Sequence, residues 1–366
     1  MRRLLVSVLL VIARTAVAQD MGARISPQFV HYSLGAPSNN TISEMAIPLF
    51  AFMPVTRNLT FDIGTAFASA RLTNTSAGQS AESKISGMTD TQLRATVNLG
   101  SDAVLLTAGV NVPTGRSTAT TSEQGAAGLI GNDFLVFPIS SMGSGFGGTG
   151  GIALAKPLGE WNLGAGFSVR HSMPFDPYQD ATTGAKLRYT PGNELRGRLG
   201  LDHPYGTGRA SVGVTYSKFD DDKIATSIYN TGDRLLAQGY VTSAMGSGDY
   251  VLSAWNLYRA SGTQADGSAS GTENITDVSA SYGLAVGGAR LEPGIDVRTW
   301  MQRNAALSLQ STVSVRYDQP VGAVTISPGA GFTIGKLAGR NTSLAGSTGT
   351  TSSLTGFRAQ LTIRTH

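Results

Sequence analysis

The chain of 366 residues contains no cysteine, so no disulfide can hold it together. Charged residues are also scarce, at 14% of the chain, whereas soluble domains usually carry about 25%. Beyond the N-terminal segment, no stretch approaches 18 consecutive apolar residues, which argues against a membrane-spanning helix. These absences argue against a disulfide-rich secreted domain and a helical membrane protein. Glycine, by contrast, is abundant, with 46 residues.

The first residues have the features of a secretory signal peptide. Arg2 and Arg3 precede an apolar stretch of about ten residues, and Ala16-Val17-Ala18 forms a small-residue cleavage site. We therefore expect residues 1–18 to be a signal peptide, cleaved between Ala18 and Gln19. The chain has 28 Lys and Arg against 24 Asp and Glu, and three of the arginines lie in this segment. The mature chain is then nearly neutral. The excess of basic residues in the full chain therefore gives no reason to expect nucleic-acid binding.

Alternating apolar and polar residues dominate the rest of the sequence. In Trp161–Val169 the odd positions are bulky or apolar, whereas the even positions are Asn, Gly and Ser. A period of two indicates a β-strand, because successive side chains point to opposite faces. Strands of about ten residues that are joined alternately by short turns and long loops are typical of an outer-membrane β-barrel.

The pattern predicts an all-β fold, a transmembrane antiparallel up-and-down barrel in a single domain over residues 19–366. We count about sixteen strands, with fourteen or twelve if the weak segments Gln28–Leu34 and Gly232–Met245 are loops. The strands are predicted at Gln28–Leu34, Glu44–Met53, Leu59–Leu72, Thr89–Leu99, Ala103–Pro113, Gly147–Lys156, Trp161–His171, Asn193–Asp202, Gly208–Phe219, Gly232–Met245, Tyr250–Ala260, Asn274–Val286, Arg290–Met301, Ala306–Tyr317, Gly322–Ile334 and Leu354–Arg364.

Seven short turns and six longer connections join these strands. The turns are rich in Gly, Pro and Asp, as tight turns require: Pro54–Asn58, Gly100–Asp102, Pro157–Glu160, His203–Thr207, Gly246–Asp249, Gly287–Ala289 and Asp318–Val321. The predicted long connections are Thr73–Met88, Thr114–Phe146, Ser172–Gly192, Asp220–Thr231, Ser261–Glu273 and Gly335–Ser353.

If the apolar set of each strand faces lipid, the polar set faces the lumen. An unpaired charge facing lipid near the midplane would cost about 2–4 kcal/mol, which favours this assignment. Such a lumen suits a channel for water-soluble or anionic solutes, although each arginine could equally brace the wall in an ion pair with an acid. The residues predicted to line the solute pathway are Arg94, Arg170, Arg196, Arg198, Arg290, Arg298, Arg316, Arg358, Glu292 and Asp296, with Arg364, Asp62, Asp202 and Asp277 also inside.

The longest connection, Thr114–Phe146, contains the apolar run Phe134–Ile139 beside Asp133. An apolar run at a loop tip would be exposed to water without some role for it. Loops of this length are usually functional or disordered. The run could fold into the lumen as a constriction, form an apolar entrance near the outer leaflet, or add a short strand above the membrane. We take Glu123, Asp133, Phe134 and Phe137 as the candidate residues of a constriction or entrance.

Catalytic and cofactor chemistry have little support in the sequence. His171-Ser172 at the end of a strand is the one candidate for a lipid hydrolase, but neighbouring strand residues point to opposite faces. The histidines are not spaced as metal ligands, and Gly143–Gly151 has no following Gly-Lys-Ser/Thr of a phosphate loop. We therefore expect no enzyme, no cofactor and no metal.

Residues 105–175 resemble outer-membrane barrels associated with phenol-degradation pathways. The resemblance is carried by Thr107–Gly115, which ends in Pro-Thr-Gly, by the glycine-rich loop that follows, and by Gly159-Glu160-Trp161. That group is similar to transporters of fatty acids and aromatic hydrocarbons, which implies passive uptake of hydrophobic small molecules. The chain lacks the Asn-Pro-Ala hatch of the fatty-acid transporters. Its last strand alternates as the usual assembly signal does, but it ends in His366.

The sequence thus predicts a channel in the outer membrane of a Gram-negative bacterium, for diffusion or facilitated uptake of small molecules. The expected partners are a small solute, outer-membrane lipid and the barrel assembly machinery, without nucleic acid. Two alternatives stay open: a lipid hydrolase that uses His171, and a structural or adhesin-like barrel.

Overall fold

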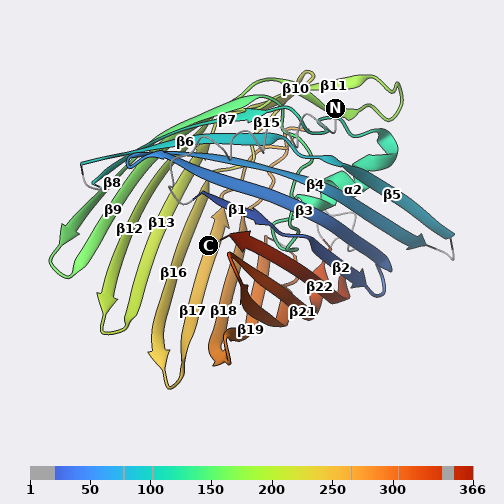
Figure 1. Ribbon diagram of the computed structural model, residues 1–366. Helices are drawn as coiled ribbons and strands as arrows, with labels where there is room; N and C mark the ends of the chain where they lie inside the picture. Colours follow the sequence, from blue (N-terminus) through green and yellow to red (C-terminus); the bar gives the residue numbers. More distant parts are fainter. Residues whose placement is uncertain are drawn as a thin grey trace.

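The computed structural model describes residues 21–76, 79–100, 103–264, 266–303, 305–339 and 350–365. The predicted signal peptide, its cleavage site and His366 lie outside these ranges. Most of the described chain forms a closed antiparallel barrel of 16 strands (Figure 1). The predicted fold class and strand number are therefore confirmed.

The barrel closes where its first and last strands meet. The first wall position consists of β1 (Gly22–Ile25) and β2 (Gln28–Leu34), which pair with β3 on one side and with β22 on the other. The fourth position is likewise divided, into β5 (Gln79–Met88) and β6 (Thr91–Leu99), which both pair with β4. The other wall strands are β3 (Asn40–Thr56), β4 (Leu59–Ser76), β7 (Val104–Val112), β8 (Gly147–Leu158), β9 (Trp161–Ser172), β12 (Glu194–Tyr205), β13 (Gly208–Phe219), β16 (Arg234–Met245), β17 (Gly248–Arg259), β18 (Glu273–Val286), β19 (Ala289–Gln302), β20 (Ser308–Val321), β21 (Val324–Ala338) and β22 (Thr351–Thr365).

Both divisions of the wall have a local cause. Between β1 and β2, Pro27 has no N–H to donate, although its carbonyl accepts from Leu361 N at 2.9 Å. Between β5 and β6, the hydroxyl of Thr89 replaces a backbone partner and accepts from Ala66 N at 2.9 Å. This second division turns Asp90 into the barrel, where it is 7% exposed.

The side chains alternate across the wall as the sequence predicts. On β20, Val313 faces outward and is 57% exposed, whereas its neighbour Thr312 faces inward and is 4% exposed. The weak segments are wall strands too, since β2 has the predicted bounds and β16 pairs along its whole length with β17. An apolar exterior with fully paired backbone is what a bilayer requires of a spanning structure.

The predicted connection Thr73–Met88 is wrong, because β4 continues to Ser76 and β5 returns from Gln79. This hairpin is polar, so it lacks the apolar stripe on which strand prediction depends. The predicted turns His203–Thr207 and Pro54–Asn58 are shorter in the structure, since β12 extends to Tyr205 and β3 to Thr56. Ser101 and Asp102 of another predicted turn lie outside the described residues.

Two of the long connections form a small second sheet at the loop end of the barrel (Figure 1). It consists of β10 (Phe175–Gln179), β11 (Lys186–Thr190), β14 (Asp222–Ile224) and β15 (Ser227–Tyr229). Tyr189 anchors it, because its ring packs edge-on against Phe175 at 5.3 Å and stacks on Tyr229 at 6.2 Å. We call this the outer sheet.

The segment Thr114–Phe146, hereafter the lumen loop, contains the 3₁₀ turn η1 (Thr121–Glu123) and the short helix α2 (Gln124–Ile130). Among the described residues, no helix is long and apolar enough to cross a membrane. Figure 1 shows α2 beside β4 and β5, and Ala126 N donates to Ser83 Oγ at 3.0 Å. The alternative of an extra strand above the membrane is wrong, since Phe134–Ile139 forms no strand.

The exposed apolar face of β20 leads to a prediction about stability. Replacing Val313 with Arg would place a charge near the middle of the strand, where lipid contact is expected. We expect the free energy of unfolding to fall by about 2–4 kcal/mol, measured by denaturant titration in lipid vesicles. The matched variant Val313→Leu keeps the surface apolar and should unfold as the wild type does. An unchanged midpoint for Val313→Arg would contradict a lipid-facing β20.

Candidate functional site: the lumen and its docked loop

The lumen loop lies inside the barrel and packs against its inner wall. Phe134 is fully buried and stacks on Trp300 of β19, with ring centroids 5.7 Å apart. Phe137 packs edge-on against Tyr32 of β2 at 5.6 Å. These aromatic contacts attach one apolar run to two separate parts of the wall. The apolar run is therefore buried by the barrel interior rather than exposed at a loop tip.

Polar side chains of the wall bind the backbone of the same run. Phe134 O accepts from Arg298 Nη1 at 3.2 Å and from Gln310 Nε2 at 3.1 Å. Glu44, which is fully buried on β3, accepts from Ile139 N at 2.9 Å. A buried backbone group without a partner would be costly, so these side chains make the buried path of the loop possible.

Asp90 holds the two ends of the lumen loop together. Its Oδ1 accepts from Gly115 N at 3.0 Å, and its Oδ2 accepts from Ser144 N at 2.7 Å. Asn111 Nδ2 also donates to this carboxylate, at 2.8 Å. Because one carboxylate binds both ends, the loop leaves and rejoins the wall at nearly one point.

The predicted loop residues take different parts in this arrangement. Asp133 forms an ion pair with Arg259 of β17, which also contacts Glu273 at 2.9 Å. Glu123 lies in η1, where it accepts from Thr120 N at 2.9 Å and from Arg116 Nη2 at 2.6 Å. Glu123 therefore stabilises the fold of the loop rather than lining an opening. With Phe134 and Phe137, all four candidates belong to the docked loop.

Most of the predicted lumen arginines lie inside the barrel in ion pairs. Near the turn end, Arg290 and Arg316 share Glu292, at 3.3 and 2.9 Å, and Arg290 also pairs with Asp249. Further along, Arg94 pairs with Asp62 at 2.7 Å, Arg298 with Asp277 at 2.8 Å, and Arg196 with Glu194 at 2.5 Å. These arginines brace the wall, which is the role that the sequence left open for each of them.

Four predicted arginines have a different environment. Within the described residues, no carboxylate lies within ion-pair distance of Arg170, Arg198, Arg358 or Arg364. The side chain of Arg358 lies across β21, where a Cβ on Gly331 would come within 2.7 Å of its Nε. Asp296, the remaining predicted residue, lies on β19 in register with Ser279 and Thr312.

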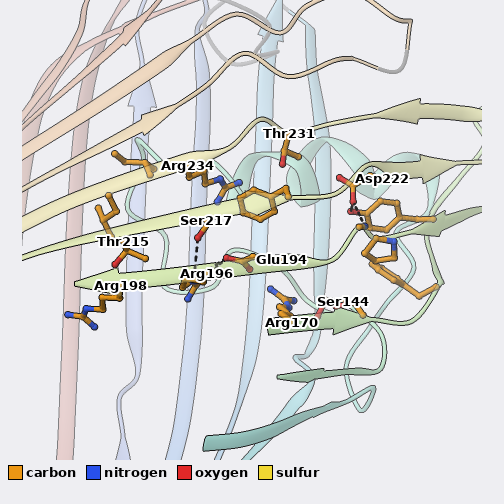
Figure 2. A pocket seen from close by; sticks show the side chains of 18 of the residues that line it. Ser144, Arg170, Glu194, Arg196, Arg198, Thr215, Ser217, Asp222, Thr231 and Arg234 are labelled. Carbon is orange, nitrogen blue, oxygen red and sulfur yellow. Dashed lines mark hydrogen bonds and ion pairs between the residues drawn. The ribbon is translucent and has the colours of Figure 1, made fainter. Parts of the chain in front are cut away.

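A cavity of about 600 Å³ lies beside the lumen loop, between the wall and the outer sheet. Figure 2 shows Arg170, Arg196, Arg198 and Arg234 among the residues that line this cavity, and they belong to β9, β12 and β16. Arg234 is not among the residues predicted from the sequence, because the alternation in Gly232–Met245 is weak. The alternation of that strand would have placed Arg234 inside. We call this cavity the arginine vestibule.

Further cavities follow along the same side of the lumen. One of about 380 Å³ shares Arg170, Glu194 and Arg196 with the arginine vestibule and reaches Arg94. Another, of about 650 Å³, shares Arg198 and Gln238 and extends to Asp202 and Arg209 toward the turn end. The space in the lumen is thus eccentric, with the docked loop against one side and arginine-lined cavities along the other.

His171 does not meet the requirements of a hydrolase on the described residues. Its Nδ1 lies 2.7 Å from Asn193 Oδ1, so one ring nitrogen has an orienting partner. No described hydroxyl group hydrogen bonds to its ring, and the adjacent Ser172 points to the inner face, where it is 8% exposed. Catalysis by His171 would lack an activated nucleophile.

Comparison with known proteins gives only distant similarities. No protein-family model matches the sequence, and no curated protein matches it. A bacterial polysaccharide outer-membrane secretin has a similar structure at 11% identity and a TM-score of 0.48, over 96% of this chain and 100% of that one.

Two further similar structures are an outer-membrane channel and a porin. The channel, from Pseudomonas putida F1, has 12% identity and a TM-score of 0.39 over 96% of this chain and 98% of that one. The anion-selective porin from Comamonas acidovorans has 13% identity and a TM-score of 0.43 over 94% and 98%. At identities this low, the similarity concerns the fold and not the solutes.

Phe134 gives a direct test of loop docking. Phe134→Ala removes the ring that packs on Trp300, and a buried Phe→Ala change typically costs about 3–5 kcal/mol. We expect Trp300 fluorescence to change and the lumen loop to become accessible to added protease, while the barrel keeps its heat-modifiable mobility on gels. Val136→Ala is the control, because Val136 is 36% exposed in the same run. If the lumen loop is equally protected from protease in Phe134→Ala and Val136→Ala, Phe134 does not hold the loop in place.

Glu123 gives a prediction about pH. Burial alone would raise the pKa of Glu123, but the hydrogen bonds from Thr120 and the charge and hydrogen bond of Arg116 outweigh it and lower the pKa below its ordinary 4.5. The charged form is therefore favoured in the folded loop, and its stabilisation is present above pH 4.5 and lost as the pH falls through the lowered value.

Protease protection of the lumen loop should accordingly be greater in the wild type than in Glu123→Gln at neutral pH. The difference should shrink as the pH falls below 4.5. If the two proteins differ in protease protection equally at pH 7 and at low pH, the charge of Glu123 does not stabilise the lumen loop.

Proposed function

We propose that this protein is a passive channel for small solutes in the outer membrane of a Gram-negative bacterium, with a preference for anions. The observation that carries the proposal is the row of adjoining cavities beside the docked loop, which share lining residues and include Arg170, Arg198 and Arg234. Short turns at one end and long loops at the other are typical of outer-membrane barrels, whose long loops face outside.

The anion preference rests on which arginines lack acidic partners. Paired arginines such as Arg196 contribute little net charge, whereas Arg170 and Arg198 lie in the cavities without a described carboxylate partner. A polar passage lined by uncompensated positive charge lowers the energy of an anion and raises that of a cation. The docked loop narrows the passage, so we assign it the role of a constriction rather than an entrance.

Single-channel recording in planar bilayers tests the proposal. In a KCl gradient, the wild type should conduct with a reversal potential that indicates anion preference. The double variant Arg170→Gln, Arg198→Gln should still conduct but with a smaller anion-to-cation permeability ratio, because the uncompensated charges are gone. Arg57→Gln removes one exposed charge from the β3–β4 turn and should leave the ratio unchanged. A folded barrel that never conducts would overturn the channel proposal.

A further inference from the structure

The arginine vestibule has two chemically different sides. Arg170, Arg196 and Arg198 come from the wall strands β9 and β12. Phe175 and Tyr189 come from the outer sheet, which covers the cavity at the loop end. A solute in this cavity would therefore meet guanidinium groups on one side and aromatic rings on the other.

The cationic side is only partly neutralised. Glu194, 7% exposed, binds Arg196 through both Nε and Nη2, at 3.0 and 2.5 Å. Arg234 lies over the ring of Phe219 at 5.0 Å, which fixes its guanidinium at the cavity wall. Arg170 and Arg198 have no described ion-pair partner, so they are free to bind an anion. Their planar guanidinium groups suit a carboxylate, which can accept two parallel hydrogen bonds.

Asp222, the acid on the opposite side, already accepts hydrogen bonds within the protein. Asp222 also lines the arginine vestibule, but it is 7% exposed. Its Oδ1 accepts from Tyr189 Oη at 3.1 Å and from Gly192 N at 2.7 Å. Both donors bind the same carboxylate oxygen, and the hydrogen bond from Tyr189 fixes its ring in place.

The aromatic side is supported by the lumen loop. Gly145 has a φ of +73°, and a Cβ there would lie 2.9 Å from Phe175 Cβ. The close approach and the left-handed backbone both favour glycine at this position. The end of the lumen loop therefore seats Phe175 against the cavity, where its ring meets the ring of Tyr189 edge-on.

We propose that the arginine vestibule is a binding site for small aromatic carboxylates, an inference that rests on the proposed channel function. The carboxylate would pair with Arg170, and the flat ring would pack against Phe175 and Tyr189. The cavity volume of about 600 Å³ falls within the range for small-molecule sites. Small inorganic anions would use the arginines alone, and neutral aromatics would use the rings alone.

Block of the chloride current in planar bilayers tests this proposal with four probes: benzoate, cyclohexanecarboxylate, acetate and benzyl alcohol. Benzoate should block at the lowest concentration, because it alone has both the charge and the flat ring. In Arg170→Gln, the half-blocking concentration of benzoate should rise about tenfold, as expected for a lost charged hydrogen bond. Arg57→Gln should match the wild type.

The aromatic side is tested separately. Tyr189→Leu should reduce the preference for benzoate over acetate, whereas Tyr189→Phe keeps the ring and should retain it. Tyr258→Leu is the matched control, since Tyr258 lies on the outer face of β17 and is 40% exposed. A conducting, anion-selective channel that benzoate blocks no better than acetate would overturn this inference and leave the channel intact. Equal block by benzyl alcohol would also overturn it, whereas absence of any conductance would instead refute the proposed function.

Discussion

The structure depends on the closure of its hydrogen-bond ladder. A strand edge left open in a bilayer would leave unpaired N–H and C=O groups, each costing several kcal/mol, so the last strand must return to the first. Here β22 pairs with β1 and β2, and these pair with β3. Closing sixteen strands produces a barrel too wide for its own inward side chains to fill. The lumen loop and the lumen cavities follow from that width.

The inner wall carries different side chains on the side where the lumen loop docks and on the opposite side. Where the lumen loop docks, the wall supplies apolar surface and a few buried polar groups, such as Glu44 and Gln310, that satisfy the loop backbone. On the other side it supplies arginines that face open space. This division explains why the lumen contains both a compact core around Phe134 and a row of polar cavities. A solute would pass on the arginine side.

The arginines also divide into two groups according to their partners. Arg290, Arg298 and Arg316 share acids with neighbouring strands and stabilise the wall. Arg170 and Arg198 lack such partners among the described residues. Sequence alternation predicts that all of these side chains point inward, but it cannot tell which of them find an acid across the strand. That depends on strand register, which shifts every cross-strand neighbour at once.

Local sequence determined the strands, their number and the two faces of the wall, because the period-two pattern and the turn residues act over a few neighbouring positions. It failed for the hairpin Thr73–Met88, which has no lipid-facing stripe, and for the outer sheet. The apolar run at Phe134 indicated that the lumen loop must be buried somewhere. Only the tertiary structure decided where, because Trp300, Tyr32 and Glu44 come from distant strands that meet only after the barrel has closed.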